Sequence, residues 1–221
     1  MQPLQQHYCE VKLMLNELLS RYPELSACKE DIENAVTTII KAYENGGKLL
    51  LCGNGGSCAD CDHIVGELMK GFLKKRPLSD EKKAEMKKNC DLLDDETLSK
   101  LQGGVPAIAL PSITALNSAF CNDVDPELMY AQTLMSLANE NDILIAISTS
   151  GNSKNVFGAV KVAKALGIKV IGLTGNSGGK IKGIADICIC APETETFKIQ
   201  ELHMPIYHYI CAKVEEYFWS V

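Results

Sequence analysis

The chain has 221 residues, of which 46% are hydrophobic and 23% are charged, a balance typical of a globular protein with a substantial core. The formal net charge of −6, from 22 basic and 28 acidic residues, argues against a nucleic-acid-binding or anionic-membrane surface. No apolar run reaches the roughly 20 residues of a membrane span, and the first seven residues lack the basic and apolar regions of a signal peptide.

Apolar residues recur at two spacings, one typical of helices and one of buried strands, and the two alternate along the chain. Helical spacing occupies residues 8–20, 24–45, 58–72, 112–121, 127–140, 153–166, 178–184 and 198–219. Short apolar runs occupy residues 48–52, 105–110, 143–147, 169–173 and 187–190. This alternation predicts an α/β fold, a three-layer sandwich in which a five-stranded parallel sheet is flanked by helices.

A hydroxyl-rich loop follows the third predicted strand, where Ser-Thr-Ser-Gly-Asn-Ser at 148–153 leads into a helix. Four of its hydroxyl groups can donate to a phosphate, those of Ser148, Thr149, Ser150 and Ser153. The Gly-Lys-Ser/Thr element of Walker loops is absent. This loop and a second Gly-rich turn, Gly53–Ser57, both fall at the carboxyl ends of predicted strands, where α/β folds bind ligands. We therefore expect a sugar phosphate as the ligand.

Side chains suited to metal binding or acid–base chemistry occur on two predicted helices. His63 and Glu67 are four residues apart, so they share one helix face. Gln200 and His208 are about 80° apart around the last helix and can border one cleft, whereas His203 lies about 140° from His208. The other interpretation is that these are ordinary surface or interface side chains.

Three further features have two interpretations each. The charged segment 74–102 is expected to be a solvated helical insertion, with a lid or an oligomer contact as the alternative. Asn122-Asp123 is typical of a turn but can also bind sugar hydroxyls. Cys58 and Cys61 form a single Cys-x-x-Cys pair, too few for a zinc ribbon, and the sequence leaves any metal or redox role open. Ten cysteines without a secretion signal predict reduced thiols and a cytoplasmic protein.

These motifs together resemble the sugar isomerase (SIS) domain family, which has a flavodoxin-like arrangement. The matching segments are Cys-Gly-Asn-Gly-Gly-Ser at 52–57, His63 and Glu67, Asn122-Asp123, the loop at 148–153, Leu-Thr-Gly at 173–175 and Ile-Gln-Glu-Leu-His at 199–203. The phosphoheptose isomerases, which convert sedoheptulose 7-phosphate to D-glycero-D-manno-heptose 7-phosphate, are the most similar group. The resemblance implies one SIS domain over 1–221, with N-terminal helices at 1–47 and a charged helical insertion at 78–105.

The resemblance also implies roles for individual residues. The substrate would be bound by Asn54, Gly55, Gly56, Ser57, Glu67, Asn122, Asp123, Ser148, Thr149, Ser150, Ser153 and Gln200. One zinc ion per subunit would be held by His63, Glu67, Gln200 and His208. Glu67 and His208 match the base and the acid of an enediol mechanism. The family implies a homotetramer whose sites contain more than one subunit, and no nucleic-acid or membrane partner is expected.

Other function classes compete with the isomerase. A non-catalytic SIS assembly protein, like the tetrameric replication-initiation regulators, has no need of Glu67, Gln200 and His208 together. A sugar-phosphate sensor of a transcription regulator needs a DNA-binding module, and the first 45 residues carry no basic cluster. The insertion at 78–105, together with Phe197 in place of the small or acidic residue frequent in the family, leaves a different ketose phosphate open as the substrate.

Overall fold

The computed structural model describes residues 14–220, and at its centre is a five-stranded parallel sheet with the order β2-β1-β3-β4-β5. The strands are β1 (Leu49–Gly53), β2 (Ala107–Ala109), β3 (Ile143–Ser148), β4 (Lys169–Thr174) and β5 (Ile187–Cys190). This is the flavodoxin-like order, in which the direction of winding reverses between β1 and β3. The predicted α/β sandwich is confirmed. The expectations for residues 1–13 lie outside the described residues.

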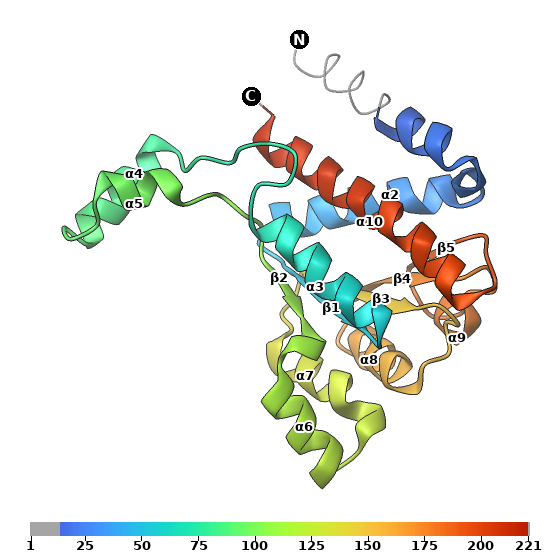
Figure 1. Ribbon diagram of the computed structural model, residues 1–221. Coiled ribbons are helices and arrows are strands. Elements are labelled where there is room, and N and C mark those ends of the chain that lie inside the picture. The colour runs from blue at the N-terminus through green and yellow to red at the C-terminus, as the bar shows by residue number, and fades with distance from the viewer. Residues whose placement is uncertain (1–13, 221) are drawn as a thin grey trace.

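Helices cover both faces of the sheet (Figure 1). One face packs against α2 (Lys29–Glu44), α3 (Gly56–Met69) and α10 (Thr196–Trp219), with residues 14–21 also helical and followed by η1 (Pro23–Cys28). The other face packs against α7 (Met129–Leu137), α8 (Lys154–Ala165) and α9 (Gly179–Lys182). The connection from β2 contains η2 (Leu110–Ser112), α6 (Thr114–Asp123) and η3 (Pro126–Leu128). No helix within residues 14–220 is long and apolar enough to cross a membrane.

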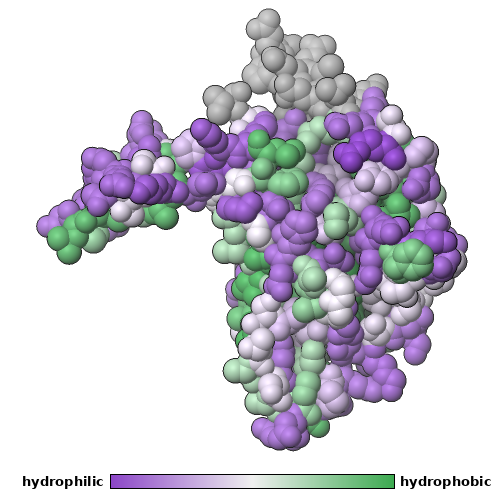
Figure 2. All heavy atoms as spheres, viewed as in Figure 1, coloured by the Kyte–Doolittle hydropathy of each residue, from purple (hydrophilic) through white to green (hydrophobic). Residues whose placement is uncertain are grey.

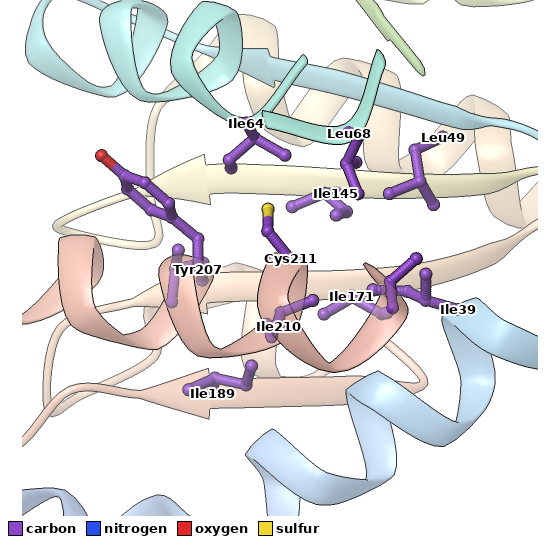
Figure 3. Close-up of a pocket in the computed structure, with 12 residues that line it drawn as sticks. Ile39, Leu49, Ile64, Leu68, Ile145, Ile171, Ile189, Tyr207, Ile210 and Cys211 are labelled. Carbon is purple, nitrogen blue, oxygen red and sulfur yellow. The ribbon is translucent and has the colours of Figure 1, made fainter. Parts of the chain in front are cut away.

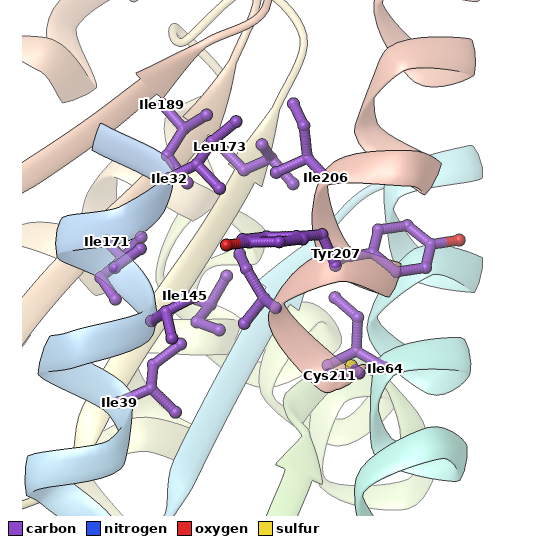
Figure 4. Packing of buried hydrophobic residues seen from close by; sticks show 14 of the residues in the cluster. Ile32, Ile39, Ile64, Ile145, Ile171, Leu173, Ile189, Ile206, Tyr207 and Cys211 are labelled. Carbon is purple, nitrogen blue, oxygen red and sulfur yellow. The ribbon is translucent and has the colours of Figure 1, made fainter. Parts of the chain in front are cut away.

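Burial on both faces explains why the strands are continuous apolar runs. In β1, Leu49 and Leu51 join the core on the α2–α3–α10 side, while Leu50 and Cys52 join the core on the opposite side. Figure 4 shows the first of these cores, where Ile39 of α2 packs toward the strands. Every position of β1 is buried, so an apolar residue is needed at each.

The second strand is shorter than predicted. The apolar run 105–110 predicted a strand over its whole length, but β2 is confined to Ala107–Ala109. Pro106 has no backbone N–H for a strand ladder, and Leu110 begins the helical turn η2 with a proline inside it. Proline therefore limits the strand at one end and favours the turn at the other.

The charged insertion forms a helical arm that projects from the rest of the molecule (Figure 1). It consists of α4 (Asp80–Asn89) and α5 (Asp95–Lys100), and its surface is mainly hydrophilic (Figure 2). The side chains of Ser79 and Asp94 cap the two helices by accepting backbone N–H groups. Helix α4 contains no buried residue, so local interactions rather than a core stabilise it.

A buried ion pair joins α10 to the segment that follows α3. Arg76 Nε donates to Glu215 Oε1 at 2.8 Å, and both side chains are almost completely buried. Glu215 also accepts the backbone N–H groups of residues 72–74, at 2.7 to 3.0 Å. The remaining donors of Arg76 bind the carbonyl oxygens of Glu67 and Leu68, in the last turn of α3. The pair therefore fixes the end of α3 against α10.

The ionised form of Glu215 contributes stability that depends on pH. Burial opposes its ionisation, but the N–H groups of Phe72 and Leu73 and the guanidinium of Arg76 lower its pKa. A lowered pKa in the folded protein means that this stability is present above the unfolded value of about 4.3 and is lost as the pH falls through the folded value. We expect Glu215→Gln to reduce the free energy of unfolding by about 3–5 kcal/mol at pH 7, because Arg76 loses its buried counter-charge.

Urea denaturation measures this loss, and the difference from wild type should shrink as the pH falls below about 4. Glu85 of α4 is exposed, so Glu85→Gln should change the free energy by less than about 0.5 kcal/mol. Equal losses in the two variants would contradict a special role for the buried pair.

Candidate functional site

A pocket of about 320 Å³ opens at the carboxyl ends of β1 and β3, where the direction of winding reverses. It is lined by Asn54, Gly55, Gly56, Ser57, Ile147, Ser148, Thr149, Ser153, Thr196 and Gln200. Three helices begin at this pocket: α3 at Gly56, α8 directly after Ser153 and α10 at Thr196. Helix N-termini present free N–H groups and a positive dipole end, so the pocket is suited to an anion such as a phosphate.

Three of the four predicted phosphate-binding hydroxyls lie at this pocket. Ser148, Thr149 and Ser153 line it, and the Oγ atoms of Ser148 and Ser153 are 3.0 Å apart. Ser153 precedes α8 but does not cap it through its side chain, so its hydroxyl is directed to Ser148 instead. Ser150 lies outside the lining, and its Oγ accepts the backbone N–H of Asn152 at 3.1 Å.

Two glycines, one in the loop at 148–153 and one at the start of α3, allow neighbouring segments to approach closely. Gly151 has a φ of +64°, and a Cβ there would lie 2.0 Å from the carbonyl oxygen of Gly178, so no other residue fits without moving the backbone. A Cβ on Gly56 would lie 2.4 Å from Gln200 Nε2. The first turn of α3 therefore lies directly against the Gln200 side chain of α10.

Asn54 is held in place by residues that the sequence analysis did not identify. Its amide exchanges two hydrogen bonds with the amide of Asn155, at 2.8 and 3.0 Å. The Tyr130 hydroxyl lies 2.8 Å from the Gly53 carbonyl oxygen and 3.1 Å from Asn54 Oδ1. Tyr130 lies in an apolar helical pattern that indicates core packing, and Asn155 gives no signal beyond its place in a first helical turn. Thr196 was also missed, although it begins the last helix.

A second polar cluster lies further along α3 and α10. His63 Nε2 is 3.3 Å from Glu67 Oε1 and 3.4 Å from His208 Nε2. Glu67 is also paired with Lys70, through Oε2 at 3.1 Å. The side chain of His63 is 40% exposed and that of Glu67 is 14% exposed. Burial and the neighbouring His63 lower the pKa of His208. The structure thus unites the predicted base, the predicted acid and a second imidazole.

A tyrosine connects this cluster to a carboxylate. The Tyr207 hydroxyl lies 2.9 Å from His63 Nδ1 and donates to Asp60 Oδ1 at 3.3 Å. Burial raises the pKa of Tyr207 and that of Asp60. Asp60 Oδ2 is buried and has no hydrogen-bond partner among residues 14–220. Figure 3 shows the Tyr207 ring beside apolar residues of the core, with its hydroxyl directed away from them.

The two polar clusters lie at different distances along the same pair of helices. Helices α3 and α10 both begin at the anion pocket and pack against each other (Figure 1). Gly56 faces Gln200 at the pocket, and His63 faces His208 further on. Eight residues of helix span about 12 Å, so Gln200 and His208 are two turns apart. Within one chain they line different pockets, and the expectation that they border one cleft stays a prediction.

Three other candidate residues lie outside the pocket. Asn122 and Asp123 are exposed at the end of α6, with Asn122 Nδ2 bound to Asp123 Oδ1 at 2.8 Å. His203 is fully buried, and its Nε2 lies 3.2 Å from the carbonyl oxygen of Thr174. Burial lowers the pKa of His203 to about 4. The predicted divergence of His203 from His208 is confirmed.

The donor types of the His63 cluster suit zinc, but the predicted set of four ligands is not assembled. Two imidazoles and a carboxylate, from His63, His208 and Glu67, form a ligand combination found at catalytic zinc sites. Among residues 14–220, however, no three His, Cys, Asp or Glu side chains are arranged to hold a metal. Gln200 lies in the anion pocket instead. The four-residue zinc site stays a prediction.

Comparisons with known proteins match almost the whole chain. Two profiles described as SIS domain match residues 14–109 and 114–210. A phosphoheptose isomerase of Aneurinibacillus thermoaerophilus is 40% identical over 185 residues, which are 84% of this chain and 80% of the relative. The phosphoheptose isomerase 2 of Campylobacter jejuni is also 40% identical, over 84% of this chain and 79% of the relative.

Solved structures of phosphoheptose isomerases also superpose on this chain over nearly its whole length. A phosphoheptose isomerase from Neisseria gonorrhoeae superposes with a TM-score of 0.69 and 28% identity, covering 96% of this chain and 97% of that chain. One from Francisella tularensis superposes with a TM-score of 0.71 and 28% identity, covering 98% and 100%. The superpositions therefore extend over nearly the whole chain.

The anion pocket makes a prediction for phosphate binding. Ser153→Ala should raise the Kd for inorganic phosphate about tenfold or more, because a hydrogen bond to a charged group contributes roughly 1.5–3 kcal/mol. Isothermal titration calorimetry measures the change. Ser136 is exposed on α7 and bonds only to Gln132 in the same helix, so Ser136→Ala should leave the Kd unchanged. An unaltered Kd in Ser153→Ala would exclude this hydroxyl from anion binding.

Proposed function

The chain belongs to the SIS domain family, and we propose that it is an aldose–ketose isomerase that interconverts sedoheptulose 7-phosphate and D-glycero-D-manno-heptose 7-phosphate. The substrate class is supported by relatives of 40% identity that are phosphoheptose isomerases. One observation carries the proposal. Two of the three helices that begin at the anion pocket, α3 and α10, also bring His63, Glu67 and His208 together, about two to three turns further on.

The anion pocket accounts for recognition of the phosphate end. Ser148, Thr149 and Ser153 supply hydroxyl donors, and three helix N-termini supply N–H groups and positive dipole ends. Asn54 and Gln200 line the same pocket and offer amide groups to the sugar hydroxyls. The carbon chain then extends along α3 and α10 toward His63. Asn122, Asp123 and Ser150 remain proposed substrate contacts. They lie outside the pocket of a single chain, so they would reach the substrate only after a change of conformation or from a neighbouring subunit.

The His63 cluster accounts for the chemistry. Isomerisation removes a proton from the carbon beside the carbonyl group and returns it to the former carbonyl carbon, through an enediol. We assign Glu67 as the base that carries this proton between the two carbons. His208 protonates the carbonyl oxygen and recovers a proton from the neighbouring hydroxyl, so the charges balance over one turnover. The low exposure of Glu67 limits exchange of the carried proton with water.

A zinc ion held by His63, Glu67, Gln200 and His208 is part of the proposal, as the resemblance to the family implies. When bound, zinc supplies Lewis-acid polarisation of the carbonyl oxygen. In the described part of the chain these side chains are not gathered around one point, and Gln200 lines the anion pocket, so zinc binding would require them to move together or a second subunit of the proposed homotetramer to complete the site. A carboxylate bound to metal is a weaker base, so zinc binding and proton transfer compete for Glu67. All nine cysteines within residues 14–220 are free thiols, which supports a cytoplasmic location.

Loss of the base should stop turnover without loss of binding. Glu67→Gln should lower kcat by about 10²–10⁴-fold, because the amide cannot accept the substrate proton. The Kd for the sugar phosphate should change little, since the phosphate pocket is separate. Steady-state kinetics and calorimetry measure the two effects. The exposed Glu30→Gln, in the first turn of α2, is the matched control and should keep full activity. A wild-type protein that binds the sugar but never converts it would favour the assembly-protein or sensor alternatives.

Metal content tests the zinc proposal separately from activity. Protein purified with zinc should contain about one ion per subunit, and His63→Ala should reduce this by at least about tenfold, since a ligand is lost. Elemental analysis of the dialysed protein measures the content. Cys58→Ser should retain the zinc if that thiol does not compete for it. Equal zinc contents in wild type and His63→Ala would remove His63 from the ligand set.

A further inference from the structure

We propose that Tyr207 is a positioning residue that sets the tautomer of His63, so that Nδ1 carries the proton and the Nε2 lone pair faces Glu67 and His208. Nothing in the comparisons with relatives assigns a role to this tyrosine. The catalytic consequence rests on the proposed isomerase activity, whereas the tautomer is a property of the folded protein alone. The two can therefore be tested separately.

The direction of the hydrogen bonds follows from counting protons. The Tyr207 hydroxyl has one proton and lies between Asp60 Oδ1, at 3.3 Å, and His63 Nδ1, at 2.9 Å. The hydrogen bond runs from the Tyr207 hydroxyl to Asp60 Oδ1, which is the direction for an ionised carboxyl group or for one that carries its proton on the unpartnered Oδ2. Tyr207 therefore donates to Asp60, and its oxygen can only accept from His63. A neutral imidazole has one N–H group, which must then be at Nδ1.

This tautomer determines what His63 offers on its other side. Its Nε2 lone pair lies 3.3 Å from Glu67 Oε1 and 3.4 Å from His208 Nε2. The Nε2 lone pair and the Glu67 carboxylate are both acceptors, so no hydrogen bond forms between them. Nε2 can instead accept the N–H of His208 or bind a cation. Glu67 Oε1 is thus not blocked by a proton from His63. A free lone pair on Glu67 is what a general base requires.

Packing prevents the tyrosine from leaving this position. Tyr207 is 2% exposed, and its ring lies in the core beside Ile64 and Cys211 (Figures 3 and 4). The ring also makes edge contacts with the rings of His63 and His208, at centroid distances of 5.4 and 5.0 Å. Asp60 lies on α3 three residues before His63, so one rigid helix carries both hydrogen-bond partners of the hydroxyl.

Nitrogen-15 NMR of the imidazole rings tests the tautomer directly. The chain has four histidines, so the His63 signals can be assigned with a His63→Gln variant. In chelator-treated wild type at neutral pH we expect a protonated Nδ1 and an unprotonated Nε2. In Tyr207→Phe the proton should move to Nε2, where it can donate to Glu67. A protonated Nε2 in the wild type, or no change in Tyr207→Phe, would overturn the proposal.

Kinetics test the consequence for catalysis. With sedoheptulose 7-phosphate, Tyr207→Phe should lower kcat about 10–100-fold, the effect typical of residues that orient an active-site histidine. KM should stay within about twofold, because the anion pocket is not altered. Tyr43→Phe is the matched control. It removes a hydroxyl that bonds to the Pro106 carbonyl oxygen, in the core and away from His63, and should leave both constants unchanged.

The outcomes separate the two proposals. A matching loss of kcat in Tyr207→Phe and Tyr43→Phe would mean general destabilisation and would overturn the positioning role. If the wild type shows the expected tautomer but never converts the sugar, the isomerase proposal fails and the tautomer assignment stands. If the wild type is active and the Tyr207→Phe tautomer moves without loss of kcat, the catalytic role of Tyr207 is refuted.

Discussion

Arg76 and Glu215 carry opposite charges inside the protein, where either charge alone would be strongly destabilising. Their remaining polar atoms are satisfied by backbone groups at the end of α3 and in the segment after it, and the Trp219 ring stacks 4.4 Å from the guanidinium. Since one partner is on α10 and the other holds the end of α3, the pair sets how far one helix lies along the other. That offset brings His63 level with His208 and Gly56 level with Gln200.

The two roles proposed for the α3–α10 pair depend on different parts of a helix. Anion binding by free N–H groups and dipoles is confined to the first turn. Acid–base chemistry requires side chains that reach across from one helix to the other, and these can lie anywhere along the contact. Because the two helices start together at the pocket, one extended ligand can meet both regions. In the proposed isomerase, phosphate affinity and proton transfer would therefore be governed by separate residues.

The charged insertion enters the chain without disturbing this arrangement. Its two ends meet at the body, where Pro77 bridges Gln102 and the Gly103 N–H donates to the Arg76 carbonyl oxygen at 2.7 Å. Helix caps stabilise the arm. Exposed ion pairs such as Lys82 with Glu85 add to this, and each pair contributes about 0.3–0.5 kcal/mol. Because the two ends of the insertion lie side by side, the insertion does not displace the strands of the sheet, and Arg76 stays beside Glu215.

The sequence by itself determined the sheet, the anion loop and the His63–Glu67 pair, because each depends on residues close together in the chain. Strands buried on both faces must be apolar throughout, and a four-residue spacing on a helix places two side chains on one face. The spacing of Gln200 and His208 in the sequence gives the angle between them around the helix. That angle takes no account of the rise of about 12 Å along the helix that separates them. Tyr207 has the apolar pattern of a core residue, and only its contact with His63, 144 positions away, shows a polar role. Such contacts depend on the offset between α3 and α10, which tertiary packing decides and no local pattern encodes.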